Sequence, residues 1–168
     1  MHTSRILSLL LLLLPGSWPA WGAAGWYTDW SSAVSTAQSC RLPLIVLFEH
    51  EGCPDCERME HSLAAPEARK ALECAVKVRL EFTEHPELTS RYGVSLTPTF
   101  LVFSPEEGGL REVYREVGSM SVSRIVQVGR SVEKLAARLS QSAADTRAVA
   151  AAPPAVAEPA TEVRSAAS

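Results

Sequence analysis

Residues 42–60 read LPLIVLFEHEGCPDCERME, and this stretch decides which fold the chain can adopt. Its first seven residues form a continuous apolar run rich in branched side chains, which is typical of a strand buried on both faces in the centre of a sheet. From Pro54 the pattern turns helical. Cys53 and Cys56 therefore stand where a buried strand gives way to a helix, with a spacing that redox pairs, metal sites and structural disulfides can all use.

The segments on either side supply the rest of an α/β domain. An amphipathic helix precedes the central strand, and Thr28 or Asp29 can cap its first turn. After the cysteines, a helical segment and the strictly alternating strand 76–82 complete a strand–helix–strand unit, which implies a parallel crossover. The remaining predicted elements are a short helix, two strands joined by a hairpin turn, and a last helix, at 86–94, 99–103, 112–117 and 122–139. We therefore expect a central mixed sheet of about four strands flanked by helices.

The first 24 residues have the pattern of a secretory signal peptide. Arg5 supplies the early positive charge, a mainly apolar segment of nine residues follows at 6–14, and Gly22 and Ala24 occupy the small-residue positions before a cleavage site. Nine residues are short of the roughly 20 that span a bilayer, and no strongly charged stop-transfer segment follows, so cleavage is preferred over an uncleaved anchor. We expect an exported, periplasmic chain that begins near Gly25 and is not stably inserted in a membrane.

The carboxy-terminal segment differs in composition from the rest of the chain. Residues 142–168 contain eleven alanines and three prolines, and no aromatic side chain that could seed a core. This composition is typical of disorder; the alanines can form a transient helix, but the prolines prevent a long one. The predicted organisation is a signal peptide at 1–24, one domain at 25–141 and a disordered tail at 142–168.

Charge and cysteine content narrow the classes of function. The formal net charge is −3 and the basic residues are scattered, so nucleic acid, which requires a clustered positive surface, is not an expected partner. The four cysteines of an exported chain are compatible with two disulfides, because thiols outside the cytosol meet an oxidising environment. Their spacing alone does not distinguish the ways in which they can pair.

The position of Cys53 at the start of a helix has a chemical consequence. The first amide groups of a helix lack internal partners and its amino end carries partial positive charge, so a thiolate is stabilised there. The thiolate is the attacking species in disulfide exchange. Cys53 is therefore the expected nucleophile, and Cys56, one turn inside the helix, is the residue that would resolve the mixed disulfide.

Three motifs in this order resemble the thioredoxin superfamily: CPDC after a buried strand, TPTF before the next strand, and Val117-Gly118 ahead of the last helix. The resemblance covers about residues 26–140. It implies a thioredoxin-like fold in which the bond before Pro98 is cis and faces the cysteines, and in which the Thr97 backbone pairs with an extended client segment. The chain looks most similar to exported members, including the periplasmic thioredoxin associated with sulfur oxidation and the carboxy-terminal domain of the periplasmic reductant DsbD.

Two departures from the superfamily pattern bear on the chemistry. The superfamily has a buried aspartate six residues before the first cysteine, and this chain has Leu47 there. The proton route at the second cysteine then needs another group, and Glu49 or His50 could supply it, although charged residues at a strand end are more often simply solvated. Gly52 replaces the tryptophan expected before the first cysteine.

Asp55 lies between the two cysteines and places a negative charge beside the Cys53 thiolate. That charge opposes the effect of the helix start and raises the pKa of Cys53 relative to an uncharged residue at this position. A less stabilised dithiol state favours the disulfide form, so we expect a reductant or isomerase and not a strong oxidant.

Cys40 and Cys74 need a separate interpretation. They precede the central strand and its parallel neighbour, so both are expected at the sheet edge opposite the active cysteines. A structural disulfide between them is one interpretation. Two separate buried thiols are the other, because cysteine packs well as a small apolar residue.

The leading hypothesis is an exported thiol:disulfide oxidoreductase that acts on protein clients. It needs no cofactor beyond the redox pair, and the sequence has no dinucleotide-binding glycine motif, so its electrons would come from an upstream protein dithiol. The alternative is a soft-metal protein that holds copper(I) through the two cysteines with His50 or His61, but it lacks a second ligand pair. A third hypothesis is a binding module whose fold no longer does redox work.

Overall fold

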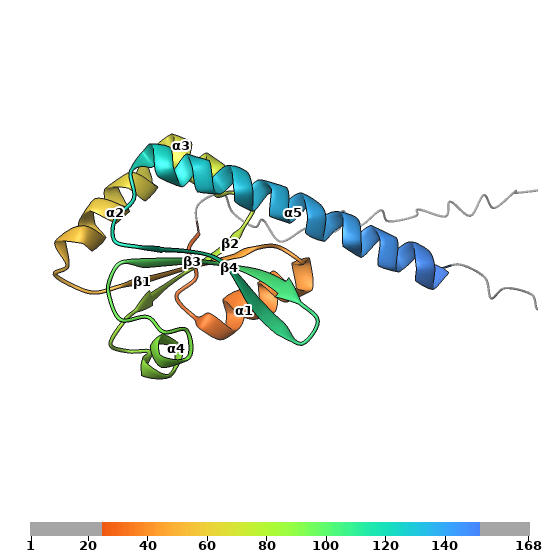
Figure 1. Ribbon diagram of the computed structural model, residues 1–168, viewed down its shortest axis with the longest axis horizontal. Helices are drawn as coiled ribbons and strands as arrows, with labels where there is room; N and C mark the ends of the chain where they lie inside the picture. Colours follow the sequence, from red (N-terminus) through yellow and green to blue (C-terminus); the bar gives the residue numbers. More distant parts are fainter. Residues whose placement is uncertain (1–24, 152–168) are drawn as a thin grey trace, which may run out of the picture.

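The computed structural model describes residues 25–151 and has a mixed four-stranded sheet with helices on both faces (Figure 1). Its elements follow the chain in the order α1 (Trp30–Cys40), β1 (Leu44–Glu49), α2 (Pro54–Ala64), α3 (Pro66–Ala71), β2 (Val76–Glu81), α4 (Pro86–Arg91), β3 (Thr99–Glu106), β4 (Gly109–Val117) and α5 (Val122–Ala151). The fold class expected from the sequence is confirmed. The predicted signal peptide at 1–24, and residues 152–168 of the predicted tail, lie outside the described residues.

Strand β1 lies inside the sheet, whose strand order is β2-β1-β3-β4. β1 runs parallel to β2, with Leu44 opposite Val76, and antiparallel to β3, with Leu44 opposite Phe103. β3 and β4 form an antiparallel hairpin that turns between Glu106 and Gly109. The parallel β1–β2 pair confirms the predicted crossover, and it places the carboxyl ends of both strands at the same edge of the sheet.

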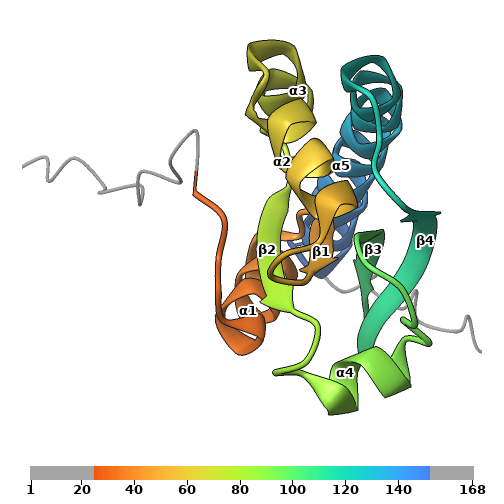
Figure 2. The same cartoon turned by 90° about the vertical axis from the view of Figure 1, so that its left-hand side faces the viewer.

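The helices form two layers, one on each face of the sheet (Figure 2). α2, α3 and α5 cover one face, in a core cluster that includes Ile45, Leu47, Met59, Leu72 and Ile125. α1 and α4 cover the other face, in a cluster that includes Ala33, Val46, Phe48, Leu88 and Phe103. Alternate residues of β1 therefore point into different cores, which explains why its sequence is a continuous apolar run.

The last helix is longer than the sequence pattern predicts. The pattern ends the helix at Leu139 and begins a disordered tail at residue 142, whereas α5 continues to Ala151. The expectation of disorder is therefore corrected for residues 142–151. The physical reason is that alanine has the highest helix propensity, and the first helix-breaking residue of this segment is Pro153. Within residues 25–151, no helix has the length and apolar character needed to cross a bilayer.

Candidate active site

Cys53 caps the amino end of α2, directly after the carboxyl end of β1. The Cys56 amide donates a hydrogen bond to the Cys53 sulfur, with 3.2 Å between nitrogen and Sγ, and Pro54 begins the helix. Proline is favourable at this position because the first amides of a helix have no internal partner. The turn before Cys53 has a φ of 73° at Gly52, a conformation that residues with a side chain rarely adopt. This conformation accounts for a glycine at the position where the superfamily pattern has tryptophan.

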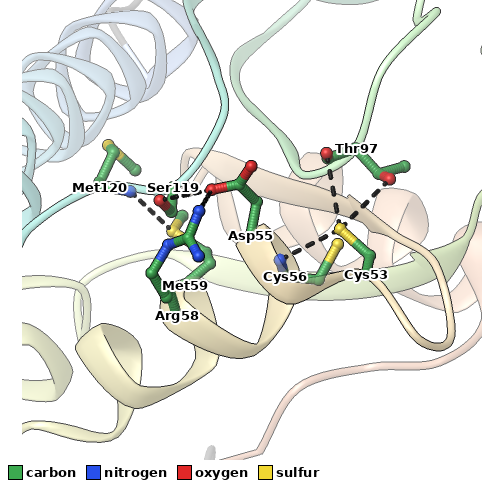
Figure 3. Close-up of polar contacts among 8 residues, drawn as sticks. All are labelled: Cys53, Asp55, Cys56, Arg58, Met59, Thr97, Ser119 and Met120. Atoms are coloured by element: carbon green, nitrogen blue, oxygen red, sulfur yellow. Dashed lines mark hydrogen bonds and ion pairs between the residues drawn. The ribbon is translucent and has the colours of Figure 1, made fainter.

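The loop before β3 brings Thr97 against the same sulfur (Figure 3). The Cys53 thiol donates to the Thr97 carbonyl and the Thr97 hydroxyl donates to Sγ, each with 3.7 Å between the heavy atoms. The Thr97–Pro98 peptide bond is cis, as the resemblance implied, and the Pro98 carbonyl accepts a hydrogen bond from the Gly118 amide at 2.8 Å. The fold thus places a residue 44 positions further along the chain on the Cys53 sulfur.

The surroundings of Cys53 favour its thiolate form. Burial by itself raises the pKa of the thiol, but hydrogen bonds with Cys56 and from the Thr97 hydroxyl outweigh burial and lower the pKa below its usual value. These donors stabilise the thiolate because they direct N–H and O–H hydrogens at the charged sulfur. Cys53 is partly exposed, so another protein can reach it.

Cys56 has the opposite protonation preference. Its side chain is buried, with 8% of its surface exposed, and burial raises the pKa of its thiol, as does its interaction with Cys53. The pair therefore combines one sulfur that ionises readily with one that keeps its proton. This asymmetry suits a nucleophile followed by a resolving thiol.

Asp55 is held by two partners at the start of α2. Its carboxylate forms an ion pair with Arg58 and accepts a hydrogen bond from the Ser119 hydroxyl at 3.1 Å (Figure 3). The positive charge of the Arg58 guanidinium offsets much of the negative charge of the Asp55 carboxylate, which weakens the effect of Asp55 on the Cys53 sulfur. The opposing charge expected from Asp55 therefore does not prevent the pKa of Cys53 from being lowered.

A cavity of about 380 Å³ opens beside the two cysteines, and Glu49 lies in its wall. Leu47, at the position of the superfamily's aspartate, is buried in the apolar core. Glu49 follows two residues later and so points to the same face of the sheet. Burial raises the pKa of Glu49, although the Arg79 Nη1 lies 3.8 Å from the carboxylate and favours its charged form.

His50 lines the same cavity and is paired there with Glu81. Its Nδ1 lies 2.6 Å from Oε1 of Glu81, and this hydrogen bond raises the pKa of the imidazole. The contact ties the carboxyl end of β1 to the end of β2. The sequence suggested Glu49 and His50 for proton transfer. Among the described residues, the Glu49 carboxylate has no partner within 3.5 Å, and it lines the cavity. Glu49 is therefore the better candidate.

Comparison with known families decides the class to which this site belongs. A family model described as a thioredoxin-like domain matches residues 30–133. The chain belongs to the thioredoxin-like family. Membership supports a thiol:disulfide oxidoreductase in general, acting on protein thiols or disulfides. Among curated proteins, none matches the chain significantly.

Solved structures agree with this assignment. The solution structure of a thioredoxin from Thermus thermophilus is 31% identical over 66% of this chain and 88% of its own, with a TM-score of 0.59. A chloroplastic thioredoxin z (18% identity, 66% and 96% coverage, TM-score 0.51) and a Trichomonas vaginalis thioredoxin (19%, 65% and 93%, 0.50) share the fold. The matched range 30–133 includes Cys53, Cys56, Thr97 and Pro98.

Two further thiols lie outside the active site of this thioredoxin-like domain. Cys40 is exposed at the end of α1, and Cys74 is half-buried against the core on the α2–α3–α5 face. Both are free thiols, so the disulfide considered between them is not formed in the described structure. Cys40 ends α1, whose buried residues belong to the core on the other face of the sheet. The alternative of two buried thiols holds only for Cys74, which is partly covered.

The histidines considered as metal ligands lie in different surroundings. His50 is bound to Glu81, and His61 is exposed in the last turn of α2. In the part of the chain that the structure describes, no three or more His, Cys, Asp and Glu side chains are grouped so as to hold a metal ion.

Sequence reasoning missed the charged residues that surround the cysteines. Arg79 and Glu81 line the cavity from β2, and Ser119 reaches Asp55 from the loop before α5. The signal for the first two was available, because the alternation that puts Val76, Val78 and Leu80 on one face of β2 puts Arg79 and Glu81 on the other. No pattern in the sequence points to Ser119.

Proposed function

We propose that this protein is an exported, periplasmic thiol:disulfide oxidoreductase that exchanges disulfides with protein clients through Cys53 and Cys56, as a reductant or isomerase. The observation that supports it most directly is the Cys53 sulfur at the start of α2, which receives hydrogen bonds from the Cys56 amide and the Thr97 hydroxyl. These donors lower the pKa of Cys53, and the thiolate is the form that attacks a disulfide. The two thiols themselves carry the electrons, so the proposal needs no further cofactor.

In the first step, the Cys53 thiolate attacks one sulfur of a client disulfide. A new S–S bond joins Cys53 to the client, and the client's other sulfur leaves as a thiolate that takes a proton from solvent. The client segment lies against Thr97 and Pro98. The Thr97 carbonyl accepts from the Cys53 thiol in the free protein, and it becomes available to an amide of the client once that thiol hydrogen is lost.

In the second step, Cys56 loses its proton and attacks the Cys53 sulfur. The Cys53–Cys56 bond forms and the bond to the client breaks. The client leaves as a dithiol that has gained two electrons, and the cysteine pair becomes a disulfide that has lost two. This step needs a base because burial raises the pKa of Cys56. Glu49 takes that role, since it lines the same cavity and burial raises the pKa of its carboxyl above its usual value. An upstream protein dithiol then reduces the disulfide and resets the pair.

The proposed direction of electron flow rests on Asp55 between the cysteines, whose remaining charge makes the dithiol form less stable than in a strong oxidant. The reduction potential of the pair, measured against glutathione, tests it. We expect a value clearly more negative than about −120 mV, the potential of the strongest periplasmic oxidant. A value near that potential would contradict the proposed direction.

The export part of the proposal rests on the signal-peptide pattern of residues 1–24. The test is the amino-terminal sequence of the protein recovered from a periplasmic extract. A mature chain that starts near Gly25 supports export, and an intact Met1 in the cytosolic fraction contradicts it.

The activity itself is tested by turbidimetric insulin reduction with dithiothreitol as the electron donor. The wild-type protein should accelerate precipitation, and Cys53→Ser should abolish the acceleration. Cys40→Ser is the matched control, because Cys40 is an exposed thiol at the far end of α1, and it should keep full activity. A wild-type protein with no effect would contradict the redox function and favour a binding module.

Clients can be identified with Cys56→Ala, which blocks the resolving step. The variant should accumulate mixed disulfides at Cys53, and these should be released by dithiothreitol. The double variant Cys53→Ser/Cys56→Ala should trap none. Equal trapping by both variants would mean that another cysteine, and not Cys53, captures the proteins.

A further inference from the structure

A second cavity, of about 610 Å³, lies between α2–α3 and β2, next to the active-site cavity. Trp26, in the segment before α1, is part of its lining. Glu60 and Arg79 line both cavities, so the two spaces are neighbours along one groove. Neither the thiol chemistry nor the client groove makes use of this second space.

The side chains around the second cavity carry an excess of positive charge. Four cations line it, namely Arg69, Lys70, Lys77 and Arg79. Two carboxylates, Glu60 and Glu73, also line it. Glu60 is occupied by Arg79, whose Nη1 lies 3.4 Å from its Oε1. Within residues 25–151, Arg69, Lys70 and Lys77 have no carboxylate within 4.0 Å.

Two of these cationic groups are both covered and incompletely satisfied. Lys77 is half-buried, and its Nζ donates one long hydrogen bond, 3.4 Å, to the Leu72 carbonyl. Burial lowers the pKa of Lys77, and the charges of Cys74 and Glu73 offset this effect only in part. The Nε of Arg79 is buried and has no hydrogen-bond partner among the described residues. Buried polar groups are normally paired, so the free Arg79 Nε–H and the weakly bonded Lys77 ammonium leave capacity for an additional acceptor.

The remaining wall is apolar. Leu63 and Leu72 belong to the core, and they line the cavity together with the indole of Trp26. The Arg79 guanidinium carbon lies 4.9 Å from the centre of the Trp26 ring, which fixes the indole beside the charged groups. A cavity of this size falls in the range of about 300–1,000 Å³ that small-molecule sites occupy.

We propose that this second cavity binds a small organic anion, with its carboxylate, sulfonate or phosphate group at Lys77 and Arg79 and its apolar part against Trp26 and Leu63. Lys77 provides the unpaired charge, and the Arg79 Nε–H provides the free donor. Arg69 and Lys70 at the rim attract the anion from solvent. A small molecule fits better than an extended peptide because the charged atoms lie inside a cavity, between a helix pair and the sheet edge.

The experiment uses two probes that differ in one charged group. 8-Anilinonaphthalene-1-sulfonate carries a sulfonate, and N-phenyl-1-naphthylamine is its uncharged counterpart. Binding of each to the folded, full-length protein is measured by calorimetry, and backbone NMR shifts locate the site. We expect the sulfonate to bind with one-to-one stoichiometry and to shift amides of β2 and α3, with the uncharged probe at least about tenfold weaker.

Single-residue variants distinguish binding at a charged site from nonspecific hydrophobic binding. Lys77→Gln should weaken sulfonate binding by about tenfold, which corresponds to 1.4 kcal/mol. Arg69→Gln at the exposed rim should weaken it by a smaller factor. Lys134→Gln is the control, because Lys134 is an exposed lysine on α5 outside the cavity. The dichroism spectrum of each variant confirms that it is folded.

Three results would overturn the proposal: equal binding of both probes, equal loss in the Lys77 and Lys134 variants, or shifts confined to residues outside the cavity. If Lys77→Gln does not fold, the Arg69→Gln variant carries the same test. None of these measurements depends on thiol chemistry, so failure of this proposal and failure of the redox function are distinguishable.

Discussion

Asp55 lies between the two active cysteines, and its partner Arg58 sets how strongly its charge acts on Cys53. Arg58→Gln should leave the carboxylate without its countercharge, so the pKa of Cys53 should rise and its alkylation at neutral pH should slow. Asp55→Asn should have the opposite effect. Because the ion pair is solvent-exposed, we expect rate changes of about 1.5- to fivefold, the range that about 0.2–1 kcal/mol gives. Unchanged alkylation rates in both variants would show that the Asp55 charge does not affect the pKa of Cys53.

Glu49 is the residue to which we assign proton transfer with Cys56. Glu49→Gln cannot accept a proton, so resolution of a preformed mixed disulfide should slow by about a hundredfold near neutral pH, the lower end of what a general base contributes. Stopped-flow fluorescence of a labelled client peptide follows this step. His50→Gln is the matched control, because His50 lines the same cavity but is bound to Glu81.

The pH profile of this step gives a sharper signature for Glu49. Burial raises the pKa of its carboxyl, so the wild-type rate should rise with pH through a step above the usual glutamate pKa of about 4.3, as the base form appears. That step should be missing in Glu49→Gln. A variant that retains the step would assign the proton transfer to another group.

The candidate residues for the sulfur chemistry could be proposed from the sequence, and the residues that contact them could not. Cys53 and Cys56 follow from a spacing that the chemistry itself requires, with the second thiol one helical turn beyond the first. Glu49 could be placed among the candidates only because it ends the central strand. Ser119, by contrast, reaches Asp55 across 64 positions, and no local pattern encodes such a contact.

Helices α5 and α3 pack so closely at Gly129 that one added methyl group would clash. A Cβ at Gly129 would lie 2.5 Å from the Ala71 carbonyl oxygen, which is backbone and cannot swing aside. Gly129→Ala should destabilise the domain by about 1–3 kcal/mol, although alanine favours the helix by about 1 kcal/mol. Urea unfolding followed by circular dichroism measures the free energy of unfolding. Ser131→Ala, an exposed position in the same helix, should not lower it, and an equally stable Gly129→Ala would contradict the contact.

The His50–Glu81 pair joins the ends of β1 and β2, and its contribution depends on pH. The hydrogen bond raises the pKa of His50, so its stabilisation is complete below the unfolded-state value and is lost as pH rises through the folded-state value. Burial acts to raise the pKa of Glu81, but the bond to His50 lowers it overall, so its stabilisation is present above the unfolded-state value and lost as pH falls. The pair should therefore stabilise the domain most at about pH 5 to 6.

The difference in melting temperature between the wild type and His50→Gln tests this window. The wild type should be more stable around pH 5 to 6, and the difference should shrink toward zero as pH rises above the His50 titration. Glu84→Gln, an exposed carboxylate in the turn after β2, is a control that should show no such maximum. A difference that is constant with pH would mean that His50 acts by packing and not by charge.

The elements were predictable where one physical signal dominated. The apolar run of β1 and the alternation of β2 identified both strands, because two-sided and one-sided burial leave different patterns. The end of α5 was not predicted correctly, because alanine-rich composition is compatible with both a helix and a disordered chain, and the prolines begin only at Pro153. Burial of the charged face of β2 also escaped prediction, because charged residues at alternate positions usually face solvent.

In the whole molecule, the redox site and the second cavity share one groove along the edge of the sheet. Glu60 and Arg79 line both spaces, so Arg79 contacts Glu49 on one side and Trp26 on the other. The order of motifs was enough to predict the fold class, a mixed four-stranded sheet flanked by helices. It was not enough to predict the second cavity, whose volume depends on how far α2 and α3 stand from β2.

The proposed redox function depends on an ionised, accessible Cys53, and the rate at which iodoacetamide alkylates this thiol as a function of pH tests it most directly. Peptide mapping by mass spectrometry reports each cysteine of the reduced protein separately, and the exposed Cys40 serves as the internal reference. We predict that Cys53 reacts fastest at neutral pH, with a profile whose midpoint lies below about 8.5, the usual pKa of a cysteine thiol. A midpoint at or above that value, with Cys53 reacting no faster than Cys40, would contradict the account.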